Sequence, residues 1–208
     1  MTHDIWHIGA RLAPSLALPG ATQASDRRRE RHMQEPGVPI AYTLRSDDSD
    51  TDRLLSELAW HLESRGLRIC GTVQANIQRA HDCRCDVDLR VLPEGPVIRI
   101  SQDLGAGAVG CRLDPGALET AVGIVEDRLS RGADMLIVNR FGKQEAEGRG
   151  FRSAIAEALA HDIPVLVGMT PLNLAAFQEF TGGLAEALPP DIAELEDWAL
   201  THLADEMH

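Results

Sequence analysis

The chain has 208 residues, of which 44% are hydrophobic and 4% aromatic, and its formal net charge is −12. This length and apolar content suffice for one domain with a core of aliphatic side chains. The acidic balance excludes a general binder of the nucleic-acid backbone, which needs a basic face, and no apolar run approaches the roughly 20 residues that span a bilayer. We therefore expect neither a nucleic-acid partner nor a membrane partner.

Residues 1–36 are predicted to form a disordered N-terminal extension. The apolar stretch 12–21 is broken by two prolines and lacks the basic start of a signal peptide. A charged run at 26–32 follows it, and Met33 is a second candidate start of translation. We expect a single domain over 37–208 and a cytoplasmic location.

The domain is predicted to alternate strands with amphipathic helices. Apolar residues recur at helical spacing in several segments, and short apolar runs bounded by turn residues lie between them. The expected elements are a strand at 38–43, a helix that ends at Gly66, a strand at 67–73, a hairpin of 85–92 and 97–101, a helix at 115–131 capped by Asp114, a strand at 135–138, a helix at about 149–160, a strand at 163–168, a short helix at 171–180 and a C-terminal helix at 191–204. This order predicts an α/β fold with a mainly parallel sheet, helices on both faces, and the hairpin inserted or at one edge.

The strand at 135–138 is the element around which a site is expected. Its uninterrupted apolar run is typical of a strand buried on both faces, and it ends at a polar turn, 139–143. In open α/β folds, ligands bind beyond the carboxyl ends of such strands. Asn139, Arg140, Gly142 and Lys143 therefore occupy the place where a binding site is predicted.

The order of elements, with Gly71-Thr72 in the second strand and Phe141-Gly142-Lys143-Gln144-Glu145 after the apolar strand, resembles small P-loop nucleoside triphosphatases. It is most similar to the thermophilic-type nucleoside-triphosphatase group. The chain also resembles an uncharacterised bacterial domain of unknown function that is similar to a diverged branch of that group. The resemblance covers residues 38–188, and segment 142–145 is its most specific part. It implies a three-layer α/β fold of P-loop type and a nucleotide with Mg²⁺ as the expected ligand.

The chain departs from this group at the residues that carry its chemistry. A working phosphate loop needs glycines and a lysine, whereas segment 44–51 has no glycine and places Asp50 at the lysine position. In the resemblance, Asn139 and Arg140 replace the magnesium-organising aspartate and the catalytic glutamate. Because phosphoryl transfer depends on metal and positioned charge, we predict a non-catalytic ligand-binding or regulatory module for a nucleotide-like or oxyanion ligand. The alternative is a divergent nucleoside triphosphatase, forming NDP and phosphate, with Glu145 and Glu147 as substitute carboxylates.

An anion-binding site is predicted where the first loop and the end of the apolar strand meet at the sheet edge. Its candidate residues are Arg45, Ser46, Thr51, Asn139, Arg140, Gly142 and Lys143. In the alternative interpretation, Arg140 and Lys143 pair with aspartates of the first loop (Asp47, Asp48 or Asp50) and close the emptied site with salt bridges. The order Asn139-Arg140-Phe141-Gly142 also suggests a guanine-reading loop, but Gly142 stands where that loop needs an aspartate. An interaction module without a small ligand would instead have a protein partner.

A metal site is a second alternative. Cys83, Cys85 and Cys111, with His81, are residue types that bind zinc or an iron–sulfur cluster, and the chain has no export signal that would favour disulfides. Buried free thiols are the competing interpretation. The glycine-rich segment 105–110 is expected to form a mobile loop rather than a dinucleotide-binding turn, because residues 111–115 separate it from the next helix.

Overall fold

The computed structural model describes residues 39–45, 50–75, 87–102 and 112–204. Contacts divide the chain into two units, Met1–Glu35 and Pro36–His208, and every described residue belongs to the second unit. The predicted N-terminal extension at 1–36 lies outside the described residues and stays a prediction.

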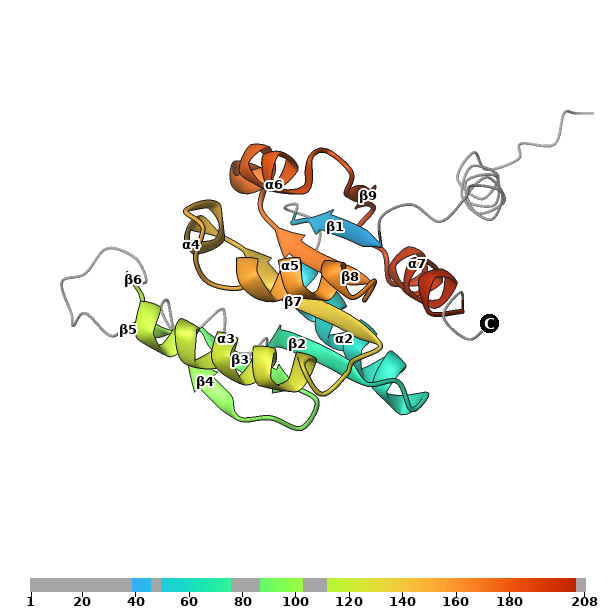
Figure 1. The fold of residues 1–208 in the computed structure, drawn as a ribbon, viewed down its shortest axis with the longest axis horizontal. Coiled ribbons are helices and arrows are strands. Elements are labelled where there is room, and N and C mark those ends of the chain that lie inside the picture. Colours follow the sequence, from blue (N-terminus) through green and yellow to red (C-terminus); the bar gives the residue numbers. More distant parts are fainter. Residues whose placement is uncertain (1–38, 46–49, 76–86, 103–111, 205–208) are drawn as a thin grey trace, which may run out of the picture. The chain divides into compact units, whose positions relative to one another are not determined.

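A seven-stranded sheet organises the second unit, with strand order β4-β3-β2-β7-β8-β1-β9 (Figure 1). Its strands are β1 (Ile40–Leu44), β2 (Ile69–Gln74), β3 (Asp88–Leu92), β4 (Val97–Arg99), β7 (Met135–Phe141), β8 (Val165–Met169) and β9 (Glu186–Leu188). The pairings from β2 through β7, β8 and β1 to β9 are parallel, whereas β3 pairs antiparallel with both β2 and β4. The predicted mainly parallel sheet with an edge hairpin is therefore confirmed. Beside it, β5 (Ser101–Gln102) and β6 (Arg112–Leu113) form a separate antiparallel pair.

Helices cover both faces of the sheet and make the three layers that the sequence predicts. The helices are α2 (Thr51–Ser64), α3 (Pro115–Leu129), α4 (Lys143–Ala146), α5 (Arg152–Ala160), α6 (Leu174–Thr181), which follows a 3₁₀ turn at Pro171–Asn173, and α7 (Ile192–Ala204). One apolar core joins the sheet to α2 and α7, and the other joins it to α3, α5 and α6. The expected cap of α3 is confirmed, because Asp114 accepts hydrogen bonds from the N–H groups of Gly116 at 2.9 Å and Ala117 at 3.1 Å.

The central strand is longer than its apolar run predicts. β7 continues through Asn139 and Arg140 to Phe141, with a register shift against β8 after Val138. Phe141 is fully buried and lies edge-on to Phe177 of α6 at a centroid distance of 5.0 Å, so packing extends the strand across two polar residues. The polar turn expected at 139–143 is thus a strand end followed by the short helix α4.

Strand β9 was not predicted. It has three residues, of which Ala187 is exposed and Glu186 half-buried, and it gives no apolar pattern. Its strand character depends on parallel pairing with β1, a contact between residues far apart in sequence.

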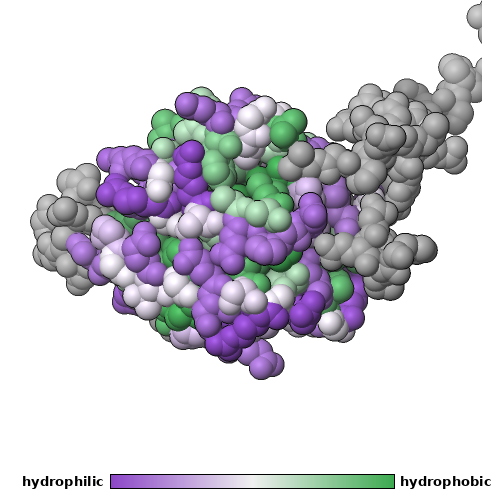
Figure 2. Space-filling model, viewed as in Figure 1, coloured by the Kyte–Doolittle hydropathy of each residue, from purple (hydrophilic) through white to green (hydrophobic). Residues whose placement is uncertain are grey.

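The surface has a mostly hydrophilic covering with local apolar areas. In Figure 2, hydrophilic side chains gather over α4, whereas hydrophobic ones gather around α6. Leu172 and Leu184, which flank α6 in sequence, are 89% and 63% exposed. Among the described residues, no helix is long and apolar enough to cross a membrane.

Candidate functional site

Two arginines of the predicted anion site face a carboxylate of the protein. Arg140 in β7 donates through Nη2 to the two carboxylate oxygens of Asp52, at 3.3 and 3.1 Å, and Nη1 of Arg45 lies 3.8 Å from the same group. Asp52, in the first turn of α2, is 7% exposed. Arg140 is therefore paired within the protein, as the salt-bridge alternative expects, but with Asp52, and Arg45 lies beside the same carboxylate. Asp50 instead caps α2 by accepting the N–H of Arg53 at 3.1 Å.

Two buried hydroxyl groups lie in the same region, on the face of the sheet that α2 covers. Thr43 in β1 and Thr51 at the start of α2 are 0% and 3% exposed, and neither hydroxyl has a hydrogen-bond partner in the described part of the chain. Gly168 in β8 pairs with Thr43 in the sheet, and a side chain at Gly168 would collide with the backbone of Asn139. Close packing therefore limits the space for a ligand here. Ser46, the remaining first-loop candidate, lies outside the described residues.

Lys143 begins α4, directly after Gly142, and its side chain is 83% exposed. Its ammonium group lies 3.6 Å from a carboxylate oxygen of Glu147, one helical turn later. Glu147 also pairs with Arg149. An exposed pair of this kind contributes little to stability and is easily exchanged for another anion. Lys143 is the single lysine of the chain.

Glu145 fastens the segment between β7 and α5. Its carboxylate accepts the N–H of Gly142 at 2.8 Å and the N–H of Phe151 at 3.1 Å, and the residue is 3% exposed. Burial raises the pKa of this carboxyl, and the two backbone N–H groups oppose the shift. Both carboxylate oxygens thus accept backbone hydrogen bonds. To act as a catalytic carboxylate, Glu145 would have to break these bonds.

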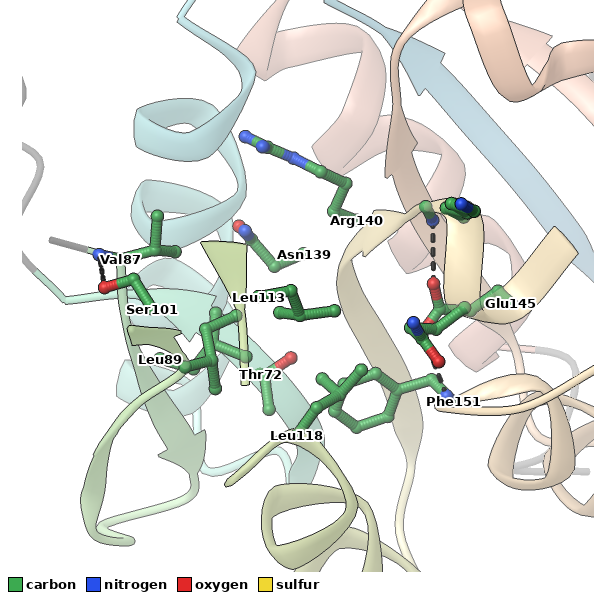
Figure 3. A pocket seen from close by; sticks show the side chains of 14 residues that line it. Thr72, Val87, Leu89, Ser101, Leu113, Leu118, Asn139, Arg140, Glu145 and Phe151 are labelled. Atoms are coloured by element: carbon green, nitrogen blue, oxygen red, sulfur yellow. Dashed lines mark hydrogen bonds between the residues drawn. The ribbon is translucent and has the colours of Figure 1, made fainter. Parts of the chain in front are cut away.

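A pocket of about 210 Å³ opens at the carboxyl ends of β2 and β7 (Figure 3). It lies on the face of the sheet that α3 and α5 cover, because most of its apolar walls belong to that core. The apolar lining consists of Val87, Leu89, Ile100, Leu113, Leu118 and Phe151. Of the predicted anion-site residues, Asn139, Arg140, Gly142 and Lys143 line it, whereas Arg45 and Thr51 do not.

Two polar side chains of this pocket are buried without a partner. Thr72 in β2 is 0% exposed and Asn139 in β7 is 4% exposed, and neither Oγ1 of Thr72 nor Oδ1 of Asn139 has a hydrogen-bond partner among the residues that the structure describes. Ser101, by contrast, accepts the N–H of Val87 at 2.9 Å. Buried polar atoms are nearly always hydrogen-bonded, so two such orphans in one cavity indicate a place for a bound molecule.

Sequence reasoning identified the β7 half of this pocket and missed Thr72 as a site residue. The position of Asn139 and Arg140 after an apolar run was sufficient to predict the β7 half of the pocket. Thr72 gave a weaker signal, a polar residue inside the apolar strand β2. Its neighbour across the sheet, Val138, precedes Asn139, and that pairing is not visible in either segment alone.

The predicted metal site lies on residues that the structure does not describe, namely Cys83, Cys85 and Cys111, so it stays a prediction. Within the described residues, no group of three or more His, Cys, Asp or Glu side chains could hold a metal ion. Cys70 is described: it is a buried free cysteine, and burial raises the pKa of its thiol to about 11. Cys70 therefore fits the alternative of a buried, unreactive thiol.

The fold and this sheet edge define an α/β protein with a ligand-sized pocket at the ends of two central strands. Residues 40–198 match the family described as protein of unknown function DUF2478, and the chain belongs to this family. The match confirms the sequence-based assignment to a domain of unknown function.

The chain is similar to one relative and to one solved structure. The molybdenum import ATP-binding protein ModC 2 of Bradyrhizobium diazoefficiens is 36% identical over 159 residues, which make up 76% of this chain and 18% of that protein. The chain thus spans less than a fifth of that relative. The solution structure of a human cancer-related nucleoside triphosphatase is similar with a TM-score of 0.49 and 12% identity, over 81% of this chain and 97% of the other.

Proposed function

We propose that this protein is a non-catalytic binding module, whose pocket at the ends of β2 and β7 takes a small nucleotide-like or oxyanion ligand. The observation that carries the proposal is the pair of unpartnered polar atoms, on Thr72 and Asn139, buried in one cavity. Leaving such a group unsatisfied costs about 1–3 kcal/mol. A ligand that hydrogen-bonds to both would recover part of that cost on binding.

The charged groups at this edge support binding rather than hydrolysis. Arg140 is paired with Asp52, and Glu145 is held by two backbone N–H groups. Phosphoryl transfer requires a metal ion and cations placed around the transferring group. Neither the segment after β1 nor the end of β7 offers the residues that supply these in working phosphate loops.

The named relative suggests which ligands to test first. That protein is called a molybdenum import ATP-binding protein, so molybdate and adenine nucleotides are the first candidates for this chain. Because the chain spans 18% of the relative, we propose no role in import for it. We propose a regulatory role that responds to one of these ligands, in the cytoplasm and with a protein partner that receives the signal.

A thermal-shift screen of the full chain tests the proposal. ATP, GTP, AMP, phosphate, molybdate and sulfate are each added with and without Mg²⁺, since a ligand of the native state raises the unfolding midpoint. We expect at least one ligand to raise the midpoint without Mg²⁺, and Asn139→Leu to reduce that rise. No rise with any ligand would overturn the proposal.

The second candidate, a divergent nucleoside triphosphatase, is supported by the ATP-binding name of the relative. It predicts Mg²⁺-dependent release of phosphate from ATP or GTP, lost in Glu145→Gln and Glu147→Gln. A phosphate-release assay on the same samples separates it from binding alone. The third candidate, a metal-handling protein using the cysteines outside the described residues, predicts zinc or iron in protein purified without chelator, measured by elemental analysis.

A further inference from the structure

The walls of the pocket restrict the chemistry of its ligand. Six apolar side chains line it, and Leu89, Leu118 and Phe151 among them are at most 5% exposed. An inorganic oxyanion placed among these walls would lose its hydration without gaining polar partners on most sides. Ligand sites with walls of this kind instead take an organic body and fix it with a few polar groups.

The two buried polar groups of the pocket come from neighbouring strands. Thr72 and Asn139 belong to the neighbouring parallel strands β2 and β7, and both are labelled in the pocket lining in Figure 3. A carboxamide presents a donor and an acceptor side by side, and a hydroxyl can serve as either. Nitrogen heterocycles carry donors and acceptors in the same arrangement along one edge, as in the pairing of asparagine with adenine.

The pocket lining also includes a positively charged side chain, that of Lys143. Lys143 reaches the pocket from the start of α4 and, within the described part of the chain, pairs with Glu147 at 3.6 Å. Arg140 also lines the pocket, but its guanidinium is occupied by Asp52. Lys143 is therefore the group best placed to meet an anionic substituent of a ligand whose body lies deeper.

We infer that the pocket binds a planar heteroaromatic ring carrying an anionic group, with the ring edge on Thr72 and Asn139 and the anion at Lys143. This inference rests on the proposed function and names its ligand class. The apolar walls of the pocket belong to the core on the α3 side of the sheet, whereas the α2 core lies on the opposite face. The volume of about 210 Å³ is below the roughly 300–1,000 Å³ of drug-sized sites, which suits one ring system with its substituent at the mouth.

The first test compares probes that share parts of this ligand. Isothermal titration of the full chain is done with AMP, GMP, adenosine, guanosine, phosphate and molybdate. We expect a mononucleotide to bind tightest, its nucleoside about fivefold more weakly, and the two oxyanions more weakly again, because one exposed charge contact adds less than 1 kcal/mol.

A matched pair of threonine variants tests the ring edge. Thr72→Val removes the hydroxyl inside the pocket, and Thr43→Val removes an equally buried, equally unpartnered hydroxyl on the other face of the sheet. We expect Thr72→Val to weaken the mononucleotide and the nucleoside by about fivefold alike, as for one lost hydrogen bond. Thr43→Val should leave both affinities unchanged. Asn139→Leu provides a second pocket variant if Thr72→Val fails to fold.

Lys143 allows a direct test of where the anion lies. Reductive methylation with ¹³C-formaldehyde labels Lys143 and the N-terminal amine, which gives two methyl signals in an NMR spectrum. We expect the Lys143 signal to shift with the mononucleotide and to move little with the nucleoside. Lys143→Met should bring the mononucleotide affinity down to that of the nucleoside, whereas Arg131→Met, which removes an exposed charge outside the pocket, should not.

The outcomes separate this inference from the function on which it rests. If phosphate or molybdate binds as tightly as any mononucleotide, and Thr72→Val weakens it, the pocket takes an oxyanion: the ring inference is overturned and the binding function stands. If no probe binds to the folded protein, both are overturned. If nucleotides bind but Thr72→Val and Asn139→Leu have no effect, the ligand lies elsewhere and the inference is overturned.

Discussion

At the scale of single residues, the segment after β7 depends on a buried carboxylate. Glu145 accepts two backbone N–H groups that lie on either side of α4, and so closes the chain from Gly142 to Phe151 into one compact turn. This arrangement positions Lys143 at the pocket mouth and Phe151 in the pocket wall. The glutamate named as a substitute carboxylate in the alternative of a divergent triphosphatase therefore also shapes the site.

The raised pKa of Glu145 predicts a pH-dependent stability. A carboxyl whose pKa is higher in the folded than in the unfolded chain binds more protons when folded, so its contribution is fully present below the ordinary value of 4.5 and is lost as pH rises through the folded pKa. We expect the free energy of unfolding of the wild type to fall with rising pH in this window relative to Glu145→Gln. Urea denaturation between pH 4 and 8 measures the difference, and parallel curves for the two proteins would contradict the prediction.

At the scale of elements, the connection between α4 and α5 is built around two glycines with positive φ. Gly148 has φ +85° and Gly150 has φ +59°, a region that other residues rarely adopt. An added Cβ at Gly150 would overlap the carboxylate of Glu145, whereas at Gly148 it would meet nothing within 4 Å. Both positions therefore need a positive φ, but only at Gly150 would a side chain collide with a neighbour.

This difference predicts unequal costs for the two alanine substitutions. Gly148→Ala should lower the free energy of unfolding by about 1 kcal/mol, from backbone strain alone. Gly150→Ala should cost about 1–3 kcal/mol more, because Glu145 must give up its position and its hydrogen bonds. Denaturant unfolding of both variants measures the two free energies of unfolding. Equal destabilisation would contradict the prediction, because it would show that Glu145 moves at no cost.

At the scale of the whole molecule, Asp52 joins elements that meet only in the folded sheet. It lies in α2, accepts from Arg140 of β7 and stands near Arg45 after β1, so one carboxylate occupies both arginines of the predicted anion site. The net charge of −12 gives the surface no general attraction for anions. Binding of an anion at these arginines must therefore compete with Asp52.

Removing this carboxylate should open the arginines to anions. We expect Asp52→Asn to increase the affinity for phosphate or molybdate and to lower stability by about 1 kcal/mol, a small cost because both arginines are partly exposed to solvent. Asp50→Asn is the control, since it makes the same charge change and asparagine also caps helices. Calorimetric titration of both variants is the measurement; an equal gain in both would assign the effect to net charge.

The sequence by itself determined the class of fold and one half of the candidate site. The helices except the short α4, and most strands, follow from local periodicity, and the cap at Asp114 and the hairpin at β3 and β4 follow from local turn chemistry. The site at the end of β7 followed from the general rule for parallel sheets. These features are decided within a short stretch of chain, so a single sequence carries them.

Only the tertiary structure decided which residues the site residues contact. Arg140 faces Asp52, 88 residues away in sequence, and Thr72 shares a pocket with Asn139 because β2 and β7 are neighbours in the sheet. The extension of β7 to Phe141 and the strand character of β9 likewise depend on partners distant in sequence. The local sequence pattern of a segment does not predict which distant residues it pairs with, because burial and strand order arise only when the whole sheet is assembled.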